Sequence, residues 1–333
     1  MSTKATQSIA AVYKEYADHW FRGHSDQYVR WANGVAASPE ILGLLASLPT
    51  IKQQPNLLFA AARFLGSQDI EFDAAAAFMV ERWPEVRAVM LSHSTQTNEA
   101  GRCATLLPVF SMIEQQEQRP LALIEVGPSA GLCLLPDLYS YSYDGASPVG
   151  SGSPVLHCAT SGNPVLPTSV PKVVWRAGVD LNPLDGTDPE IIRWLRALIW
   201  PGETKRLEQL DQALETLNKL KKGELKESAG IPQLVAGDLN EHVASLVTAA
   251  PAGSVPVVFH SAVLAYLDPS ARERFAKTMS ALDCHWVSNE NFFMDPAGDT
   301  QQSSTTGFFT LALNGFPLAH TGQHGAELHW ISR

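Results

Sequence analysis

The sequence has few of the features that mark nucleic-acid-binding, membrane or secreted proteins. Its 24 lysines and arginines are outnumbered by 34 acidic residues, and the net charge is −10. The longest basic run is only 219–222, so we expect no surface for a phosphate backbone. The longest apolar run, 74–80, is far shorter than the roughly 20 residues of a membrane span. Residues 1–10 lack the charged and then apolar pattern of a secretion signal.

Cysteine is also scarce, and its four copies are scattered without a C-x-x-C pair. This spacing is typical of neither a disulfide framework nor a zinc knuckle. We therefore expect a protein of the reducing cytoplasm that binds no metal. The chain is 45% apolar over 333 residues, which is enough to build the cores of two domains.

The first 119 residues carry a helical pattern and no convincing strand. Apolar side chains recur at intervals of three and four residues, as in the stripe Ile9, Val12, Tyr13, Tyr16 and Trp20. We predict an all-α domain over 1–119, including a helix over 74–91 that is kinked at Pro84.

From residue 120 onward, short apolar runs alternate with helical patterns. The strands that we predict cover residues 121–126, 172–180, 233–237, 255–259, 285–288, 308–313 and 326–331. Residues 130–135 are expected to open a helix, and the Gly-, Pro- and Ser-rich stretch 144–171 to form loops or a small hairpin. This alternation predicts an α/β domain over 120–333. Its sheet would be Rossmann-like, doubly wound and mostly parallel, with seven strands and an antiparallel edge.

The motif that best indicates a ligand site is Glu125-Val-Gly-Pro-Ser-Ala-Gly-Leu132, at the end of the first predicted strand. Gly127 and Gly131 allow a sharp turn and a close approach of a ligand to the backbone. A helix beginning there would present free N–H groups to a polar or anionic ligand. We therefore expect a nucleotide-like ligand at this motif.

This motif resembles the first motif of class I S-adenosylmethionine-dependent methyltransferases, and the likeness extends over roughly 120–333. The middle glycine of the usual motif is Ser129 here. Together with residues 178–185 (GVDLNPLD) and 259–267 (FHSAVLAYL), the motif is similar to a bacterial family of unknown function with an N-terminal helical region.

The resemblance implies a methyltransferase that uses S-adenosylmethionine as cofactor. It places Glu125, Gly127, Ser129 and Gly131 around the methionine part of the cofactor, Asp180 at the ribose and Asp238 near the adenine. His260 and Ser261 would face the transferred methyl group, with His260 as the candidate catalytic residue. The helical region, with Trp20, Trp31 and Trp83, would cover the cleft and select the acceptor, although these tryptophans also suit a core.

Each of these residues also has a structural interpretation. Asp180 lies 55 residues after Glu125, where roughly 20 is common in nucleotide folds; either an insertion separates the two, or another acid fills the role. Asp238 suits a helix N-cap, and His260 suits a polar group at a strand end. A further set, Asn98, Glu99 and Arg102, either reaches toward the motif or serves in capping and surface pairing.

Two other functions fit the same residues. Gly127-x-Ser129-x-Gly131 matches the nucleophile elbow of a serine hydrolase, with Asp238 or Asp268 and then His285, His320 or His324 in the required order. A module that binds S-adenosylmethionine or a nucleotide without catalysis would also keep this fold. His320, His324 and His329 cross a Gly322–Gly325 turn, a spacing that does not predict a metal site. The sequence names neither the acceptor nor the oligomeric state.

Overall fold

The computed structural model describes residues 3–68, 71–96, 98–225, 229–294, 300–302 and 307–331. The chain divides into two compact units. The helical unit comprises Met1–Thr97 and Asp188–Glu208, and the sheet unit comprises Asn98–Thr187 and Gln209–Arg333. The division differs from the boundary expected at residue 119, because the helix before the first strand belongs to the sheet unit. No helix in the described ranges is long and apolar enough to cross a membrane.

The helical unit is built from short helices whose apolar faces meet in one core. Its helices are α1 (Thr3–Glu15) with a π-helical turn (Tyr16–Trp20), α2 (Asp26–Ala37), α3 (Pro39–Leu45), α4 (Pro55–Phe64), α5 (Phe72–Glu81), α6 (Trp83–Ser92) and α8 (Pro189–Leu198). Prolines begin several of them, since a first-turn proline loses no hydrogen bond. Pro84 therefore starts α6 instead of kinking one long helix. Trp31 is fully buried.

The sheet unit contains a ten-stranded sheet with the order β2-β3-β12-β11-β10-β7-β6-β1-β4-β5. The strands are β1 (Leu121–Val126), β2 (Ser140–Tyr143), β3 (Val155–Ser161), β4 (Val173–Asp180), β5 (Gln233–Ala236), β6 (Val255–Ser261), β7 (His285–Glu290), β10 (Phe308–Leu313), β11 (Phe316–Gly322) and β12 (Glu327–Trp330). A separate pair is formed by β8 (Phe292–Met294) and β9 (Thr300–Gln302). Neighbouring strands are parallel, except that β10 is antiparallel to β7 and β11, and β11 to β12.

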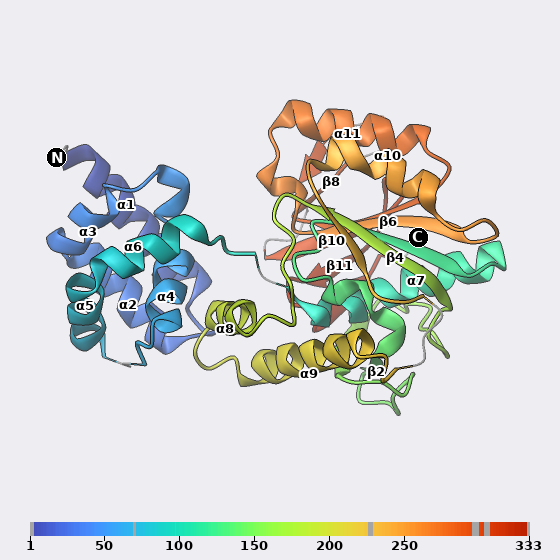
Figure 1. Cartoon of the computed structure of the whole chain (residues 1–333), viewed down its shortest axis with the longest axis horizontal. Helices are drawn as coiled ribbons and strands as arrows, with labels where there is room; N and C mark the ends of the chain where they lie inside the picture. The colour runs from blue at the N-terminus through green and yellow to red at the C-terminus, as the bar shows by residue number, and fades with distance from the viewer. Residues whose placement is uncertain are drawn as a thin grey trace. The chain divides into compact units, whose positions relative to one another are not determined.

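Helices lie on both faces of this sheet. Figure 1 shows α10 (Leu239–Ala249) and α11 (Pro269–Ala281) side by side over one face. Their buried Val243, Phe275 and Met279 share a core with β-strand residues such as Ile124 and Val258. On the other face, Phe110 of α7 (Cys103–Glu117) contacts Phe259, with ring centroids 5.2 Å apart. Helix α9 (Thr204–Lys221) begins in residues of the helical unit and ends in residues of the sheet unit.

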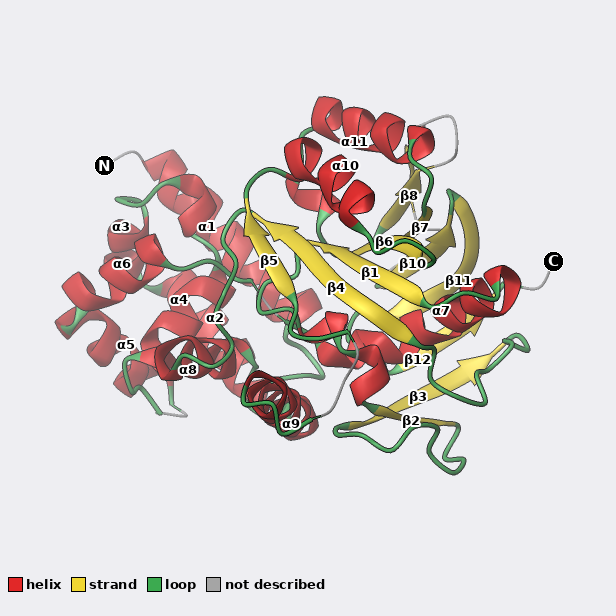
Figure 2. Cartoon of the chain, turned by 45° about the vertical axis from the view of Figure 1, so that its right-hand side comes forward, coloured by secondary structure: helices red, strands yellow, loops and turns green. Residues whose placement is uncertain are grey.

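The sheet corrects the expected strand count of seven to ten. The stretch 144–171 contributes β3, which pairs in parallel with β2 and β12, so it is not only loops. The closing strand pair is in fact three strands, because residues 316–322 form β11 between the two that were expected. Figure 2 shows β2 and β3 at one end of the sheet and β5 at the other.

Candidate functional site at the carboxyl edge of the sheet

The five strands β5-β4-β1-β6-β7 are mutually parallel, so their carboxyl ends meet at one edge. In chain order these strands are the third, second, first, fourth and fifth of the parallel set. The chain therefore adds β4 and then β5 on one side of β1, and afterwards adds β6 and then β7 on the other side. Ligands of open α/β sheets bind at this reversal, outside the carboxyl ends of the strands. The predicted site residues of β1 and β6 lie at this position.

The loop after β1 has an unusual backbone. Gly127, Ser129 and Gly131 all adopt positive φ, at 71°, 53° and 77°. A Cβ on Gly127 would come within 2.5 Å of Val263 Cγ2, so a side chain is excluded by space as well as by conformation. A Cβ on Gly131 would meet nothing closer than 3.6 Å, so that glycine is required by its φ alone. The loop thus packs closely against the turn after β6.

One expectation for this loop is wrong. Residues 130–135 do not open an α-helix, and the chain makes two 3-10 turns instead, Leu132–Leu134 and Pro136–Leu138. The left-handed conformation of Gly131 and the proline at 136 interrupt the helical hydrogen-bond pattern. No helix dipole therefore points at the loop from this segment.

Residues ahead of α7 hold the loop in place, as one sequence interpretation predicted. Asn98 donates from Nδ2 to the Pro128 carbonyl oxygen at 3.0 Å and accepts from the Leu132 N–H at 2.9 Å. Arg102 donates from Nη1 to the Ser261 carbonyl oxygen at 3.0 Å, which ties this segment to the end of β6. The reach of Asn98 toward the motif is confirmed, whereas Arg102 bonds to the carbonyl oxygens of Ser261 and Gln323.

Asp180, the last residue of β4, contacts the same loop. Its Oδ2 accepts a hydrogen bond from the Ser129 N–H at 2.8 Å, across 51 residues of sequence. Its Oδ1 accepts from the Asn182 N–H at 2.9 Å. The long interval contains the two 3-10 turns and strands β2 and β3, which form an insertion between β1 and β4. The ends of two neighbouring parallel strands are thereby joined through a carboxylate.

Glu125 is a buried acid directly before the loop, with 5% of its surface exposed. Its Oε2 has no hydrogen-bond partner among the described residues. Burial raises the pKa of this carboxyl well above its ordinary value of 4.5, and Cys133 and Asp180 raise it further, while Arg102 opposes the shift. Burial therefore shifts the protonation balance of Glu125 toward the neutral acid.

Asp238 has the local role that its position allows. It is the N-cap of α10, and its Oδ1 accepts from the Asn240 N–H at 2.7 Å. The strand before it, β5, pairs with β4 so that Ala236 is the partner of Asp180. Asp238 thus lies at the same sheet edge as Asp180, one strand farther from β1.

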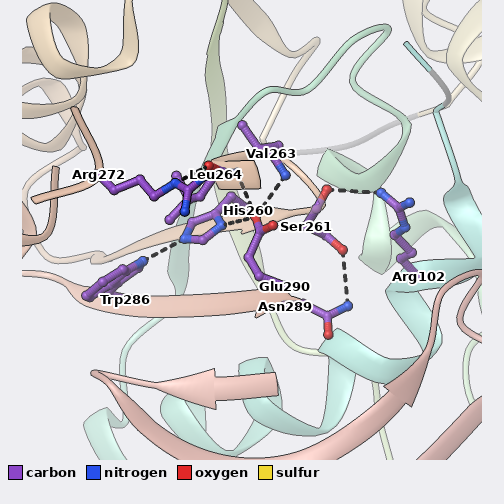
Figure 3. A network of polar contacts seen from close by, with 9 residues as sticks. All are labelled: Arg102, His260, Ser261, Val263, Leu264, Arg272, Trp286, Asn289 and Glu290. Atoms are coloured by element: carbon purple, nitrogen blue, oxygen red, sulfur yellow. Dashed lines mark hydrogen bonds and ion pairs between the residues drawn. The ribbon is translucent and has the colours of Figure 1, made fainter. Parts of the chain in front are cut away.

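His260 and Ser261, at the end of β6, belong to the polar network drawn in Figure 3. His260 is fully buried; its Nδ1 lies 2.8 Å from Glu290 Oε1, and its Nε2 accepts from Trp286 Nε1 at 2.9 Å. An indole N–H only donates, so the imidazole is neutral, with its proton on Nδ1. Both ring nitrogens are thus engaged inside the protein. This geometry suits a positioning role, and the catalytic role expected of His260 stays a prediction.

Sequence reasoning missed the residue at the centre of this network, Glu290. Its Oε1 accepts the His260 hydrogen bond and also the backbone N–H groups of Val263 and Leu264, at 2.8 and 3.1 Å. Ala262, which lies between the end of β6 and Val263, adopts a positive φ of 59°, which is uncommon for a residue with a side chain. The sequence feature that could have indicated Glu290 is the polar triplet Ser288-Asn-Glu290, which ends β7 at the carboxyl edge of the sheet.

Two of the histidines near the C-terminus contact an acid or a hydroxyl, and His320 lies opposite His329 in the pairing of β11 with β12. His324 lies 3.0 Å from Glu99, and His329 lies 2.8 Å from the Ser161 hydroxyl. Within the described residues, no group of three His, Cys, Asp or Glu side chains is arranged to hold a metal. Two hollows, of about 630 and 540 Å³, lie away from the motif loop: the first in the helical unit, the second at the amino ends of β6 and β7.

Comparison with known proteins gives a family without an assigned activity. A search of the curated proteins found no match. The model of one family, described as "Uncharacterized protein conserved in bacteria (DUF2332)", matches residues 10–330. Because that match covers both units, the chain belongs to this bacterial family.

Proposed function

We propose that this protein binds S-adenosylmethionine in a Rossmann-like crevice at the ends of β1 and β4, and that it transfers the methyl group. The observation that carries the proposal is the contact between Asp180 and the backbone of the motif loop. It brings an acid at the end of the second parallel strand to the glycine-containing loop of the first, beside the reversal in strand order. This is the arrangement that the methyltransferase resemblance implied for the ribose acid.

The charges around the loop favour this cofactor over a phosphate-bearing nucleotide. Pyrophosphate is commonly bound at a helix N-terminus, and here the loop continues into 3-10 turns beside the two acids Glu125 and Asp180. S-adenosylmethionine has no phosphate, and it carries a sulfonium and an amino group, both cationic. The missing helix N-terminus leaves a pyrophosphate without its usual donors, whereas the acids suit the cationic groups of S-adenosylmethionine.

The residues of this chain would bind the cofactor and orient its methyl group. The Asp180 carboxylate, which accepts from the backbone N–H groups of Ser129 and Asn182, would accept from the ribose hydroxyls of the cofactor. Glu125 Oε2 lacks a partner among the described residues and would gain one from a cationic group. Arg102 and Glu290 hold the end of β6 and the turn after it. Bound S-adenosylmethionine supplies an already activated methyl group, so positioning and exclusion of water are what the protein must add.

Calorimetry and thermal unfolding with S-adenosylmethionine test the proposal. At 100 times the dissociation constant, the ligand should add about 2.7 kcal/mol to the free energy of unfolding. The Asp180→Asn variant should bind about 10- to 100-fold more weakly, because a charged acceptor is lost. Asp283→Asn is the matched control, since Asp283 is exposed and lies two residues before the amino end of β7.

The possible outcomes separate the competing functions. Absence of heat and of a thermal shift at millimolar ligand would overturn the proposal, and so would tighter binding of NAD. Unchanged binding by folded Asp180→Asn would remove Asp180 from the site. Binding without transfer to any of a panel of methyl acceptors would favour a non-catalytic binding module.

A serine hydrolase is the second candidate, favoured by the left-handed backbone of Ser129 directly after β1. Other observations count against it. Ser129 is 3% exposed, Asp238 and Asp268 cap helices, and His285 lies at the amino end of β7.

A serine-reactive fluorophosphonate followed by intact-mass measurement separates the two enzymes. An adduct at Ser129 that is absent from Ser129→Gly would favour acyl transfer. The methyltransferase proposal instead expects no adduct and cofactor binding within a few-fold in both proteins. The glycine adopts positive φ without strain, and we expect a change in stability of roughly 0.5–1 kcal/mol.

A further inference from the structure

The helical unit contains a hollow of about 630 Å³ that the proposed methyltransferase site does not involve. All of its lining residues belong to this unit. One side of the hollow is formed by α4 and the residues after it, and the other side is formed by α8. The two helices pack together in the helical unit (Figure 2). Its volume is within the range of 300–1,000 Å³ that is common for small-molecule sites.

Three arginines line this hollow, although the chain as a whole carries a net charge of −10. Arg193 and Arg196 are one turn apart on α8, and Arg63 extends from α4. Like charges one helical turn apart repel each other. Guanidinium groups bind carboxylate and phosphate with paired N–H donors, so a cluster of arginines favours an anionic ligand.

Two of the guanidinium groups are held in place by the protein itself. Arg63 donates from Nη1 to the carbonyl oxygens of Ala197 and Ile199 at the end of α8. These contacts do not use its Nε and Nη2. The Arg193 guanidinium lies 4.2 Å from the centre of the Phe64 ring, a stacking that leaves its donors pointing along the plane of the group. Because both side chains are already ordered, a ligand would lose less entropy on binding them.

A buried hydroxyl without a partner marks the same hollow. Ser67 lines it, is only 3% exposed, and its Oγ has no hydrogen-bond partner among the described residues. A buried polar group normally has a partner, because leaving it unpaired is costly. The hydroxyl can donate to an anion, and Gln27 and Gln68 also line the hollow.

We propose that this hollow binds a small organic anion, a phosphate ester or a carboxylate with a compact apolar body. Arg63, Arg193 and the Ser67 hydroxyl would hold the anionic group. Ile192, Pro201 and Leu207, which also line the hollow, would contact the apolar body. The site belongs to the helical unit alone, so it is independent of the cofactor proposed for the sheet unit.

Calorimetry on the full chain with phenyl phosphate, phenylacetate and phenol tests this site. Both anions should bind and phenol should not. The anion that binds more tightly identifies whether the natural ligand is a phosphate ester or a carboxylate. Arg193→Gln should weaken binding about 10- to 100-fold, because a charged hydrogen-bond donor is lost. Arg193→Lys should recover only part of that loss, since lysine keeps the charge without the paired donors. Ser67→Ala should weaken binding several-fold.

The controls keep the result interpretable if a variant is damaged. Arg87→Gln removes an exposed arginine of α6 outside the hollow and should bind as the parent does. Asp180→Asn should also bind both anions normally, which separates this site from the cofactor site. Absence of heat with both anions at millimolar concentration would overturn the proposal. Equal binding of phenol would do the same, as would unchanged binding by folded Arg193→Gln.

Discussion

Two buried glutamates at the carboxyl edge of the sheet have opposite surroundings. Glu290, 1% exposed at the end of β7, collects three hydrogen bonds on Oε1 from His260, Val263 and Leu264. The Oε2 of Glu125, 5% exposed near the end of β1, has no donor among the described residues, and neither has the Oε2 of Glu290. The contrast lies in the three donors to Glu290 Oε1 and in the burial that raises the pKa of Glu125. The two acids therefore differ in the donors around them and not in depth.

This difference indicates which acid builds the site and which is available to a ligand. A carboxylate that accepts backbone N–H groups fixes the turn around it, because its removal would leave those donors buried and unpaired. A buried carboxyl without such donors is destabilised as an anion. Such a group is suited to meet a cation that arrives with a ligand. We infer that Glu290 positions the turn after β6 and that Glu125 faces the ligand.

The largest effect should come from Glu290→Ala. The change leaves the His260 ring and two backbone N–H groups without their acceptor, so we expect a loss of about 3–5 kcal/mol in the free energy of unfolding. Urea unfolding followed by circular dichroism measures it. Glu273→Ala on the exposed face of α11 is the control and should change stability by no more than about 0.5 kcal/mol. A loss for Glu290→Ala as small as that of the control would show that the network does not hold the turn.

A smaller effect is expected where the two loops touch, at Gly127. The left-handed conformation costs alanine about 1–2 kcal/mol, and its Cβ would meet Val263 Cγ2 at 2.5 Å, adding about 1 kcal/mol or more. The double variant Gly127→Ala with Val263→Ala should recover the steric part but not the conformational part. Additive losses in this double-mutant cycle would mean that the loops do not pack together.

The smallest effect should be the pH dependence contributed by Glu125. Burial raises the pKa of this group above its ordinary value of 4.5, so the folded protein keeps a proton that the unfolded chain has already released. Stability therefore decreases as the pH rises above about 4.5, until Glu125 ionises in the folded state. Glu125→Gln removes this dependence and should be more stable near pH 7 by on the order of 1 kcal/mol.

Unfolding curves of the parent and Glu125→Gln from pH 4 to 8 give the test, because their difference cancels the other titrating groups. The two proteins should converge at the acid end and separate toward neutral pH. Parallel curves, or a parent that gains stability relative to the variant as the pH rises, would contradict the burial argument. Saturating S-adenosylmethionine should narrow the gap if a cationic group of the ligand meets Glu125.

The sequence predicted the elements whose pattern is local. The strands 121–126 and 308–313 carry their own apolar runs between turn residues, and the structure places them as expected. Strand β11 was not predicted, because Pro317 and the polar His320 and Thr321 obscure its alternation. The short helix expected after the motif failed for a similar reason, since Gly131 and Pro136 outweigh the apolar residues between them.

The site was predictable only in part, because its contacts depend on which strands become neighbours. Asp180 could be chosen from its position at a strand end. Glu290 reaches His260 only because β6 and β7 pair with His260 opposite Ser288, a register that apolar alternation does not specify between two buried strands. The orphaned state of Glu125 depends on the burial of the whole edge, which no single segment encodes.

The insertion between β1 and β4 affects the order in which the chain folds. Strand β3 joins the rest of the sheet through β12, where Ser161 pairs with His329, residues that are 168 positions apart. Such distant pairing slows folding, because a long loop must close before any contact forms. At about 5–20 residues per second, the ribosome needs roughly 10–30 s to synthesise that interval. During this time strands β2 and β3 form an isolated two-stranded ribbon with an unpaired edge. A chaperone would be most useful at this stage of synthesis, because an unpaired edge favours aggregation.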